Sequence, residues 1–310
     1  MSAIINSASF AKALWPGVNT WYGDAYNQYP VEWDKLFEKN TSRKQFEEDV
    51  GGSYFSLAVA KTEGQPVTYD SARQGFTSRY QHVVYALGFI ITREAFDDDQ
   101  YDVIGKMKAQ SLAFSMRQTK EIVAANIFNR AFNTSYVGGD SATLIASAGG
   151  GGSSTHPNVA GGTYTNGVAT AVDLSEAALE QACIDIADFK NDRGLKIAVR
   201  PRKLIIPKEL MFEATRILKT EGQVYSADNT LNAIKTMGSI PEVVVNHYLT
   251  DVDAWFILTD VKNGLKYFER NGDEFTMDED WDTENAKYKA RARYSFGWTD
   301  PRGAYGSPGA

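Results

Sequence analysis

The sequence predicts an α+β fold whose second half alternates helices and strands. Residues 97–133 contain no proline and one glycine, and apolar residues recur there at helical spacing. Residues 286–296 alternate between apolar and cationic or polar side chains, which is the period of a strand. Between these two segments, helical and strand patterns follow one another from residue 173 to residue 268.

The totals fit a folded protein and exclude several classes. With 310 residues, one large body or two modest subdomains are expected. Hydrophobic residues make up 43% and charged residues 23%, which is ordinary for a soluble globular protein. The net charge of −7 and the scattered cations argue against a dedicated nucleic-acid binder. The single cysteine, Cys183, excludes an intrachain disulfide framework and fits a reducing compartment.

Residues 1–50 are rich in aromatic side chains and turn formers, with short helices expected near Glu32–Phe37 and Arg43–Asp49. We expect neither a secretory signal nor a membrane span, since no basic cluster precedes an apolar core and no long apolar run occurs. The large rings need something to pack against, either the body of the protein or another subunit. They are Trp15, Trp21, Tyr22, Tyr26, Tyr29 and Trp33.

Residues 65–91 are rich in β-branched and aromatic residues and are interrupted by the polar stretch "DSARQG". This pattern predicts a long β-hairpin with a polar tip, which must lie on a neighbour because a two-stranded ribbon is marginal alone. The long helix follows, with Asp97–Asp99 at its N-terminus. Its buried stripe is predicted to be Leu112, Met116, Val123, Ile127 and Ala131.

Residues 138–170 are rich in glycine and serine and are interpreted as a seam between two subdomains. After them we predict a helix that is opened by the capping pair Asp173 and Glu176 and ends near Gly194. A strand at Lys203–Ile206 and a helix beginning at Pro207 come next. Further strands are predicted over residues 243–246, 255–258 and 264–268.

The last strand has one apolar and one cationic face. Its cations are Lys287, Lys289, Arg291 and Arg293. Just before it, residues 269–284 hold eight acids and one arginine, a net charge of −7, which we interpret as a solvated loop or an intersubunit charge partner. The cations are predicted to pair with acids of the same or a neighbouring subunit, and contact with nucleic-acid phosphates is the alternative.

No catalytic or metal-binding pattern stands out. The three histidines, His82, His156 and His247, are isolated in the sequence, and no nucleophile elbow, zinc motif or phosphate loop occurs. His82 and Cys183 are expected to be packed core groups. Arg200, Arg202 and Lys203 precede a helix and raise the possibility of an anion site. Since no glycines are present there and Pro207 lacks an amide donor, these cations are better interpreted as framework or surface residues.

The order of these elements resembles the major capsid protein of tailed bacteriophages, with the fold named after the phage Hong Kong 97. "YALGFIITREAFDDD", the His156-Pro157 pair and "LKIAVRPRKLIIPKELMFEATRILKT" look like stretches of the Mu-like major head subunit family. The resemblance implies an α+β capsid fold and a structural, non-enzymatic role without cofactors. A long N-terminal scaffolding segment is not expected, and no lysine and asparagine pair for covalent crosslinking is identified.

The resemblance also implies a division of the chain. It comprises an N-terminal arm (1–50), an extended β-hairpin loop (51–97), a spine helix of the peripheral domain (98–137), the glycine- and serine-rich connection (138–170), an α/β axial domain (171–262), and return strands to the peripheral domain with a C-terminal tail (263–310). Candidate intersubunit contacts are Trp15, Trp21, Trp33, Tyr69, Arg73, Phe76, Arg79, Arg200 and Arg202.

The implied partners are copies of the chain itself, in hexamers and pentamers of a shell. Portal, scaffolding or decoration proteins and packaged DNA are further partners, and no membrane is involved. The implied location is the virion, assembled in the host bacterial cytoplasm. Two alternatives stay open: an encapsulin-like nanocompartment shell, and an enzyme that binds a phosphorylated ligand near residues 200–207.

Overall fold

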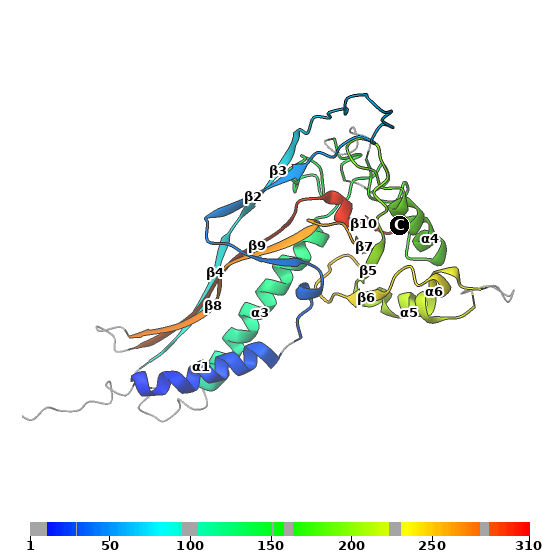
Figure 1. Ribbon diagram of the computed structural model, residues 1–310. Coiled ribbons are helices and arrows are strands. Elements are labelled where there is room, and N and C mark those ends of the chain that lie inside the picture. Colours follow the sequence, from blue (N-terminus) through cyan, green and yellow to red (C-terminus); the bar gives the residue numbers. More distant parts are fainter. Residues whose placement is uncertain are drawn as a thin grey trace, which may run out of the picture.

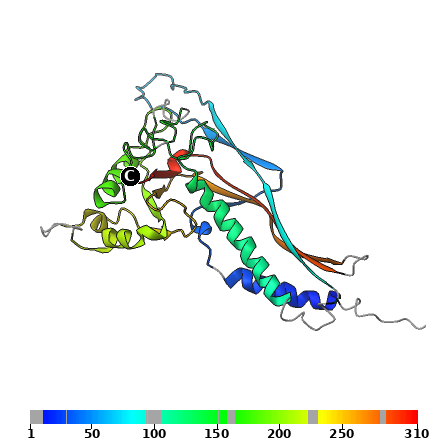
Figure 2. The same ribbon diagram turned by 180° about the vertical axis from the view of Figure 1, so that it is seen from behind.

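The computed structural model describes residues 11–28, 30–92, 94, 105–150, 152–157, 164–222, 231–279 and 285–310. Two bodies lie side by side, an elongated one that carries the long helix and a more compact one that carries three short helices (Figures 1 and 2). Among the described helices, none is both long and apolar enough to cross a bilayer.

The first body is a four-stranded sheet covered by a long helix. The strand order is β1 (Glu38–Thr41), β8 (Leu265–Glu279), β9 (Ala286–Trp298) and β4 (Val83–Ile91). Helix α3 (Lys106–Asn129) lies on one face of this sheet, and helix α1 (Ala11–Gln28) lies against α3 (Figure 1). At 1.5 Å per residue, α3 spans about 36 Å.

The period-two pattern of β9 is confirmed. Tyr288, Ala290, Ala292 and Tyr294 are buried, whereas Lys287, Lys289 and Arg291 are exposed and Arg293 is half-buried. The helical stripe of α3 is also confirmed. Leu112 and Met116 are buried, and Val123 and Ile127 pack against the same core. The strand and the helix therefore face each other through the side chains that their periodicity selects.

The second body is a mixed four-stranded sheet with helices on it. The strand order is β10 (Ala304–Ser307), β7 (Trp255–Thr259), β5 (Pro201–Ile206) and β6 (Glu242–Val245), in which β5 and β6 are parallel and the other pairs antiparallel. The helices are α4 (Glu176–Ala187), α5 (Met211–Lys219) and α6 (Ala233–Met237). Short 3-10 turns occur at Trp33–Lys35, Lys208–Leu210 and Pro301–Gly303.

One apolar core runs through both bodies because β7 is buried on its two faces. Phe256 points toward the first body, with its ring centroid 5.3 Å from that of Phe128 and 5.7 Å from that of Phe132. Trp255 and Ile257 alternate with it and pack into a second core under the helices. Because successive side chains of β7 point to opposite faces of the sheet, this strand packs against the first body on one face and against the helices on the other.

Several predicted boundaries were wrong. Residues 43–49 do not form a helix, because β2 (Phe46–Gly52) lies there and pairs with β3 (Gln74–Gln81). Residues 65–91 do not form a hairpin, since β3 and β4 follow one another and pair with β2 and β9 respectively. The hairpin is β2–β3, and its loop comprises residues 53–73. Alternation in sequence identifies strands but does not select their partners.

Close backbone approach explains one glycine of this hairpin. A Cβ on Gly75 would lie 2.5 Å from the carbonyl oxygen of Gly51, beside the register shift between Val50 and Gly52. Only a residue without a side chain fits this irregular pair. The glycines of "GG" and "QG" therefore belong to the hairpin stem and not to a tip.

Further corrections concern helix ends and the tail. Helix α4 is capped by Ser175, whose Oγ accepts the Ala178 N–H, and it ends at Ala187 instead of near Gly194. The start of the long helix before Gly105 lies outside the described residues. The described part of the acidic stretch, up to Glu279, is strand β8 and not a loop. Residues 304–307 join the second sheet, not the first.

Much of the described part of the glycine- and serine-rich connection is packed. Leu144, Ile145 and Ala146 are fully buried, and Ile145 and Leu144 belong to the core that joins the bodies. His156, Asp140 and Asn166 are buried with them. The segment lies in the chain between α3 of the first body and α4 of the second, and much of it is packed instead of forming an open linker. Composition alone does not distinguish a linker from a segment whose small residues allow close packing.

Five described aromatic rings near the N-terminus pack against the same chain, namely Trp21, Tyr22, Tyr26, Trp33 and Phe37. The centroid of the Trp33 ring lies 4.5 Å from that of Tyr267 and 5.6 Å from that of Phe296. The backbone N–H of Trp33 donates to Glu121 Oε2 at 3.0 Å. Tyr22 stacks on Phe275 at 4.6 Å. Trp33 as an intersubunit contact was therefore wrong. Tyr29 lies outside the described residues, as does the side chain of Trp15.

Charged groups complete this anchor. The Lys120 ammonium lies 4.9 Å from the Trp33 ring and 3.4 Å from Glu269 Oε2. The Glu121 carboxylate accepts the N–H groups of Glu32 and Trp33, and burial raises the pKa of Glu121. Buried charges of this kind persist only with such partners. Arm and spine helix thus form one unit within a subunit.

Trp33→Ala is expected to lower the free energy of unfolding of the unassembled chain by about 3–4 kcal/mol, because it empties a fully enclosed aromatic site. Chemical denaturation monitored by far-UV circular dichroism measures the loss. Tyr69→Ala is the matched control, since Tyr69 is 92% exposed, and it should change stability by less than about 0.5 kcal/mol. Equal stability of the Trp33 variant and the wild type would contradict the packing described above.

Candidate assembly surfaces

The loop between β2 and β3 exposes an unusual number of large apolar side chains. They are Tyr54, Phe55, Leu57, Val59, Val67 and Tyr69. Within residues 53–73 no strand or helix is present, and nearly all side chains are exposed. A cluster of apolar groups in water marks a surface that another protein covers. Of the predicted contacts, Tyr69 and Arg73 lie on this loop.

The hairpin stem is fixed to the body. The Tyr80 hydroxyl lies 2.6 Å from Thr299 Oγ1, and Lys266 forms an ion pair with Asp49. Phe76 packs against the second core, and the exposed Arg79 guanidinium lies 3.8 Å from the Phe46 ring centroid. The stem therefore gives the loop a firm base on the first body (Figure 1).

The cationic face of β9 meets acids of β8 in register. Glu274 lies opposite Arg291 and Asp278 opposite Lys287. On the other side, the exposed Val84 and Ile90 of β4 lie opposite Arg293 and Lys287. Cross-strand opposite charges attract, so part of the cationic row is compensated within the chain. This register favours charge pairing within the chain over a phosphate track.

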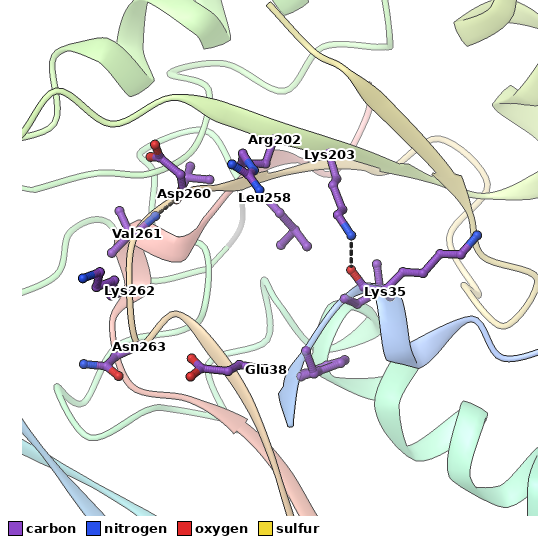
Figure 3. A pocket seen from close by; sticks show the side chains of 12 residues that line it. Lys35, Glu38, Arg202, Lys203, Leu258, Asp260, Val261, Lys262 and Asn263 are labelled. Carbon is purple, nitrogen blue, oxygen red and sulfur yellow. Dashed lines mark hydrogen bonds between the residues drawn. The ribbon is translucent and has the colours of Figure 1, made fainter. Parts of the chain in front are cut away.

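Of the three cations near the second sheet, Arg202 and Lys203 line a cavity of about 580 Å³ (Figure 3), and Arg200 does not. Lys203 Nζ donates to the Lys35 carbonyl oxygen at 2.7 Å and lies 3.3 Å from Glu242 Oε2. The carboxylates of Glu38 and Asp260 line the same space as Arg202 and Lys262.

This cavity does not fit a phosphate. Its lining mixes both charges and contains no helix N-terminus, while Pro207 precedes only a 3-10 turn before α5 begins at Met211. Arg200 and Arg202 are exposed, and the Arg200 N–H donates to Asp260 Oδ1. The geometry thus favours a framework or surface role for these cations.

Each histidine is held by hydrogen bonds to nearby polar side chains. His82 is buried between Ser42 Oγ and Ser295 Oγ, each 3.0 Å from a ring nitrogen, and burial lowers its pKa, helped by nearby Arg293. His247 Nδ1 lies 2.6 Å from Glu32 Oε1. Burial raises the pKa of Cys183 to about 11, which leaves its thiol protonated at neutral pH.

His156 belongs to a buried polar network that the sequence did not predict. Its Nδ1 lies 2.5 Å from Asp140 Oδ2, and its Nε2 lies 3.0 Å from Asn166 Oδ1. All three residues are at most 1% exposed, so no substrate reaches them. Among the described residues, no group of three or more histidine, cysteine, aspartate or glutamate side chains is placed to hold a metal ion.

The comparisons with known proteins decide the family. A family model described as "Phage capsid protein" matches residues 75–307. The chain belongs to the phage capsid protein family. The match begins inside strand β3 and includes the spine helix and every strand of the two four-stranded sheets except β1, so it covers most of the elements described above.

Solved structures share the fold of this capsid protein at low identity. A virus-like particle from Pyrococcus furiosus aligns with a TM-score of 0.53 and 12% identity over 94% of this chain and 97% of that one. A Mycobacterium phage Che8 structure gives 0.53 and 11% over 91% and 93%. The procapsid of bacteriophage JBD30 gives 0.51 and 14% over 98% and 76%. No curated protein sequence matches.

The predicted fold class, an α+β phage major capsid fold, is confirmed by these matches, and so is the predicted function of a shell-forming phage capsid protein. The intersubunit role of individual residues stays a prediction. For the capsid protein, the exposed loop is a surface whose apolar side chains would gain from contact with another copy.

Proposed function

We propose that the chain is the major head protein of a tailed bacteriophage, and that hexamers and pentamers of it form an icosahedral shell around double-stranded DNA. The observation that carries this proposal is the exposed apolar loop at residues 53–73 on a chain of the phage capsid family. On a self-associating protein, another copy of the chain can bury such a surface, and heterologous contacts of this kind can close into rings.

The division of labour follows from the two bodies. The extended loop would lie across an adjacent subunit, and the second body would form the axial domain at the centre of a capsomer. The first body, with α3 and the return strands, would form the peripheral domain. Trp21, Tyr69, Arg73, Phe76, Arg79, Arg200 and Arg202 remain candidate contacts. Portal, scaffolding or decoration proteins, assembly in the host cytoplasm and a purely structural, non-enzymatic role belong to the same proposal.

Size measurement tests this function directly. Purified protein at increasing concentration should move from small species to closed particles in size-exclusion chromatography and negative-stain microscopy. If it remains a monodisperse monomer at high concentration, with or without a co-expressed scaffolding protein, the shell function is wrong. Stabilisation of such a monomer by phosphate esters would support the ligand-binding enzyme instead.

A nanocompartment shell is the second candidate, because the fold aligns with that of the Pyrococcus furiosus virus-like particle. The contents of particles purified from the native host distinguish the two. Double-stranded DNA with portal and tail proteins supports the phage head. A single packaged enzyme without those proteins supports the nanocompartment.

Neutralising the cationic row of β9 tests its role. Changing Lys287, Lys289, Arg291 and Arg293 to glutamine should raise the protein concentration needed for assembly by about tenfold, since several weak surface ion pairs act together. Light scattering measures assembly, and filter binding measures affinity for DNA. A matched variant with glutamine at the exposed Lys61, Lys106, Lys108 and Lys219 should assemble normally.

The opposite result would show that the cationic side chains of β9 contact DNA. In that case assembly of the four-fold variant would be unchanged, and its affinity for duplex DNA would fall steeply together with the salt dependence of binding.

A further inference from the structure

A turn of the second body lies against the base of the extended loop. Residues 191–195 form this turn, in which the buried Asn191 accepts the N–H groups of Arg193 and Leu195 through Oδ1, each at 2.9 Å. Gly194 adopts a φ of 79°, a left-handed conformation that glycine allows without strain. The turn therefore presents Asp192 and Arg193 from a fixed backbone (Figures 1 and 2 show the loop bending over to this body).

Arg193 contacts both legs of the loop. Its Nε donates to the Tyr54 carbonyl oxygen at 3.1 Å on the outgoing leg, and its Nη2 donates to the Ser71 carbonyl oxygen at 2.6 Å on the returning leg. Nη2 also lies 3.6 Å from Asp70 Oδ1. A planar guanidinium with several donors reaches two carbonyl groups at once, which an ammonium does not match in geometry.

Acidic side chains complete the junction. Asp192 Oδ1 accepts the Tyr54 N–H at 3.0 Å, so the backbone of Tyr54 is held at both of its polar groups. Asp70 accepts the N–H of Ser56 at 2.8 Å, which ties the two legs together across the loop. The backbone donors of Ser56 and Ser71 lower the pKa of Asp70, so this carboxylate is charged at neutral pH.

We propose that Asp192 and Arg193 are positioning residues for assembly, a clamp that sets the direction of the extended loop before it meets another copy. The proposal rests on the proposed shell function. Beyond the clamp the loop has no strand or helix, and its apolar side chains are exposed. Fixing both legs in the free subunit removes part of the ordering cost from the contact and restricts the directions in which the loop projects.

Amide hydrogen exchange of the unassembled subunit tests the clamp. Arg193→Ala should speed exchange of the Tyr54, Ser56 and Ser71 amides, which donate to Asp192 and Asp70 at the junction, by about fivefold to tenfold. Loss of the guanidinium releases the two legs that these hydrogen bonds hold. Asp192→Ala should do the same for the Tyr54 amide. Arg193→Lys should behave like the alanine variant, because the positive charge remains but the two-carbonyl contact is lost.

Lys196→Ala is the matched control. It removes the neighbouring surface ion pair with Asp188, which lies within the second body, and should leave exchange of the loop unchanged. Unchanged exchange in the Arg193→Ala variant, or full protection in the Arg193→Lys variant, would overturn the clamp.

Assembly of the same variants separates this proposal from the shell function. Wild-type shells together with slower or more heterogeneous assembly of Arg193→Ala, at unchanged melting temperature, support the positioning role. Wild-type shells and equally fast, uniform assembly of an Arg193→Ala variant with a mobile loop would overturn that role. If the wild type never forms shells, the proposed function fails, and the exchange experiment still decides whether the clamp exists.

Discussion

Asn166→Ala should lower the free energy of unfolding by about 4 kcal/mol, because removal of this buried side-chain amide leaves several buried polar groups without hydrogen-bond partners. Asn166 is 0% exposed. Its Oδ1 accepts the Ala146 N–H at 2.7 Å and lies 3.0 Å from His156 Nε2. Its Nδ2 lies 2.8, 2.9 and 3.0 Å from the carbonyl oxygens of Leu144, Pro301 and Ala304. Denaturant unfolding of the unassembled subunit measures the loss.

Two variants make this test specific. Asn166→Asp keeps the shape but has no N–H donor for the carbonyl oxygens around Nδ2, so it should destabilise at neutral pH at least as much as alanine. Thr165→Ala changes the exposed neighbour and should cost less than about 0.5 kcal/mol. A loss below about 1 kcal/mol for Asn166→Ala would show that the amide does not join the connection to the C-terminal segment.

The second large effect is expected at the tip of the loop. Replacing Phe55, Leu57 and Val59 by serine should abolish shell assembly, with at least about a hundredfold loss of particles, because burial of each side chain contributes about 1.5–3 kcal/mol to a contact. These side chains are 62%, 73% and 71% exposed, so the unassembled variant should keep its melting temperature within about 2 °C. Negative-stain microscopy and calorimetry measure the two quantities.

The control variant changes polar residues of the same loop. Serine at Lys61, Glu63 and Gln65 alters loop composition to a similar extent without removing apolar surface, and should assemble like the wild type. Normal particles from the apolar triple variant would mean that the loop is not an assembly surface. A large drop in melting temperature would mean that these residues stabilise the subunit itself.

Much of the fold was predictable because its signals are local. Strand β9 alternates from Lys287 to Tyr294, and α3 carries its apolar residues at helical spacing. Strand β5, predicted at Lys203–Ile206, lies at Pro201–Ile206. The exposed cations of β9 follow from the same alternation. Each of these features is decided within a few residues by backbone geometry.

The candidate surfaces were only partly predictable. The sequence indicated an extended segment near residues 65–91, but the exposed apolar tip lies at 53–73, before most of that segment. Trp33 was expected at a surface and is a core residue. Asp192 and Arg193 carried no signal at all, because an aspartate and an arginine before a glycine are ordinary in any turn.

The sequence by itself determined the α+β class, the long helix, the striped last strand and the resemblance to phage capsid proteins. Only the tertiary structure decided that β2 is the partner of β3, that Tyr22 and Trp33 are buried in their own subunit, and that part of the glycine- and serine-rich connection is packed around Asn166. Periodicity reports which face of an element is apolar. Which distant surface covers that face depends on how the whole chain buries its apolar area and satisfies its polar groups, and no local pattern encodes that choice.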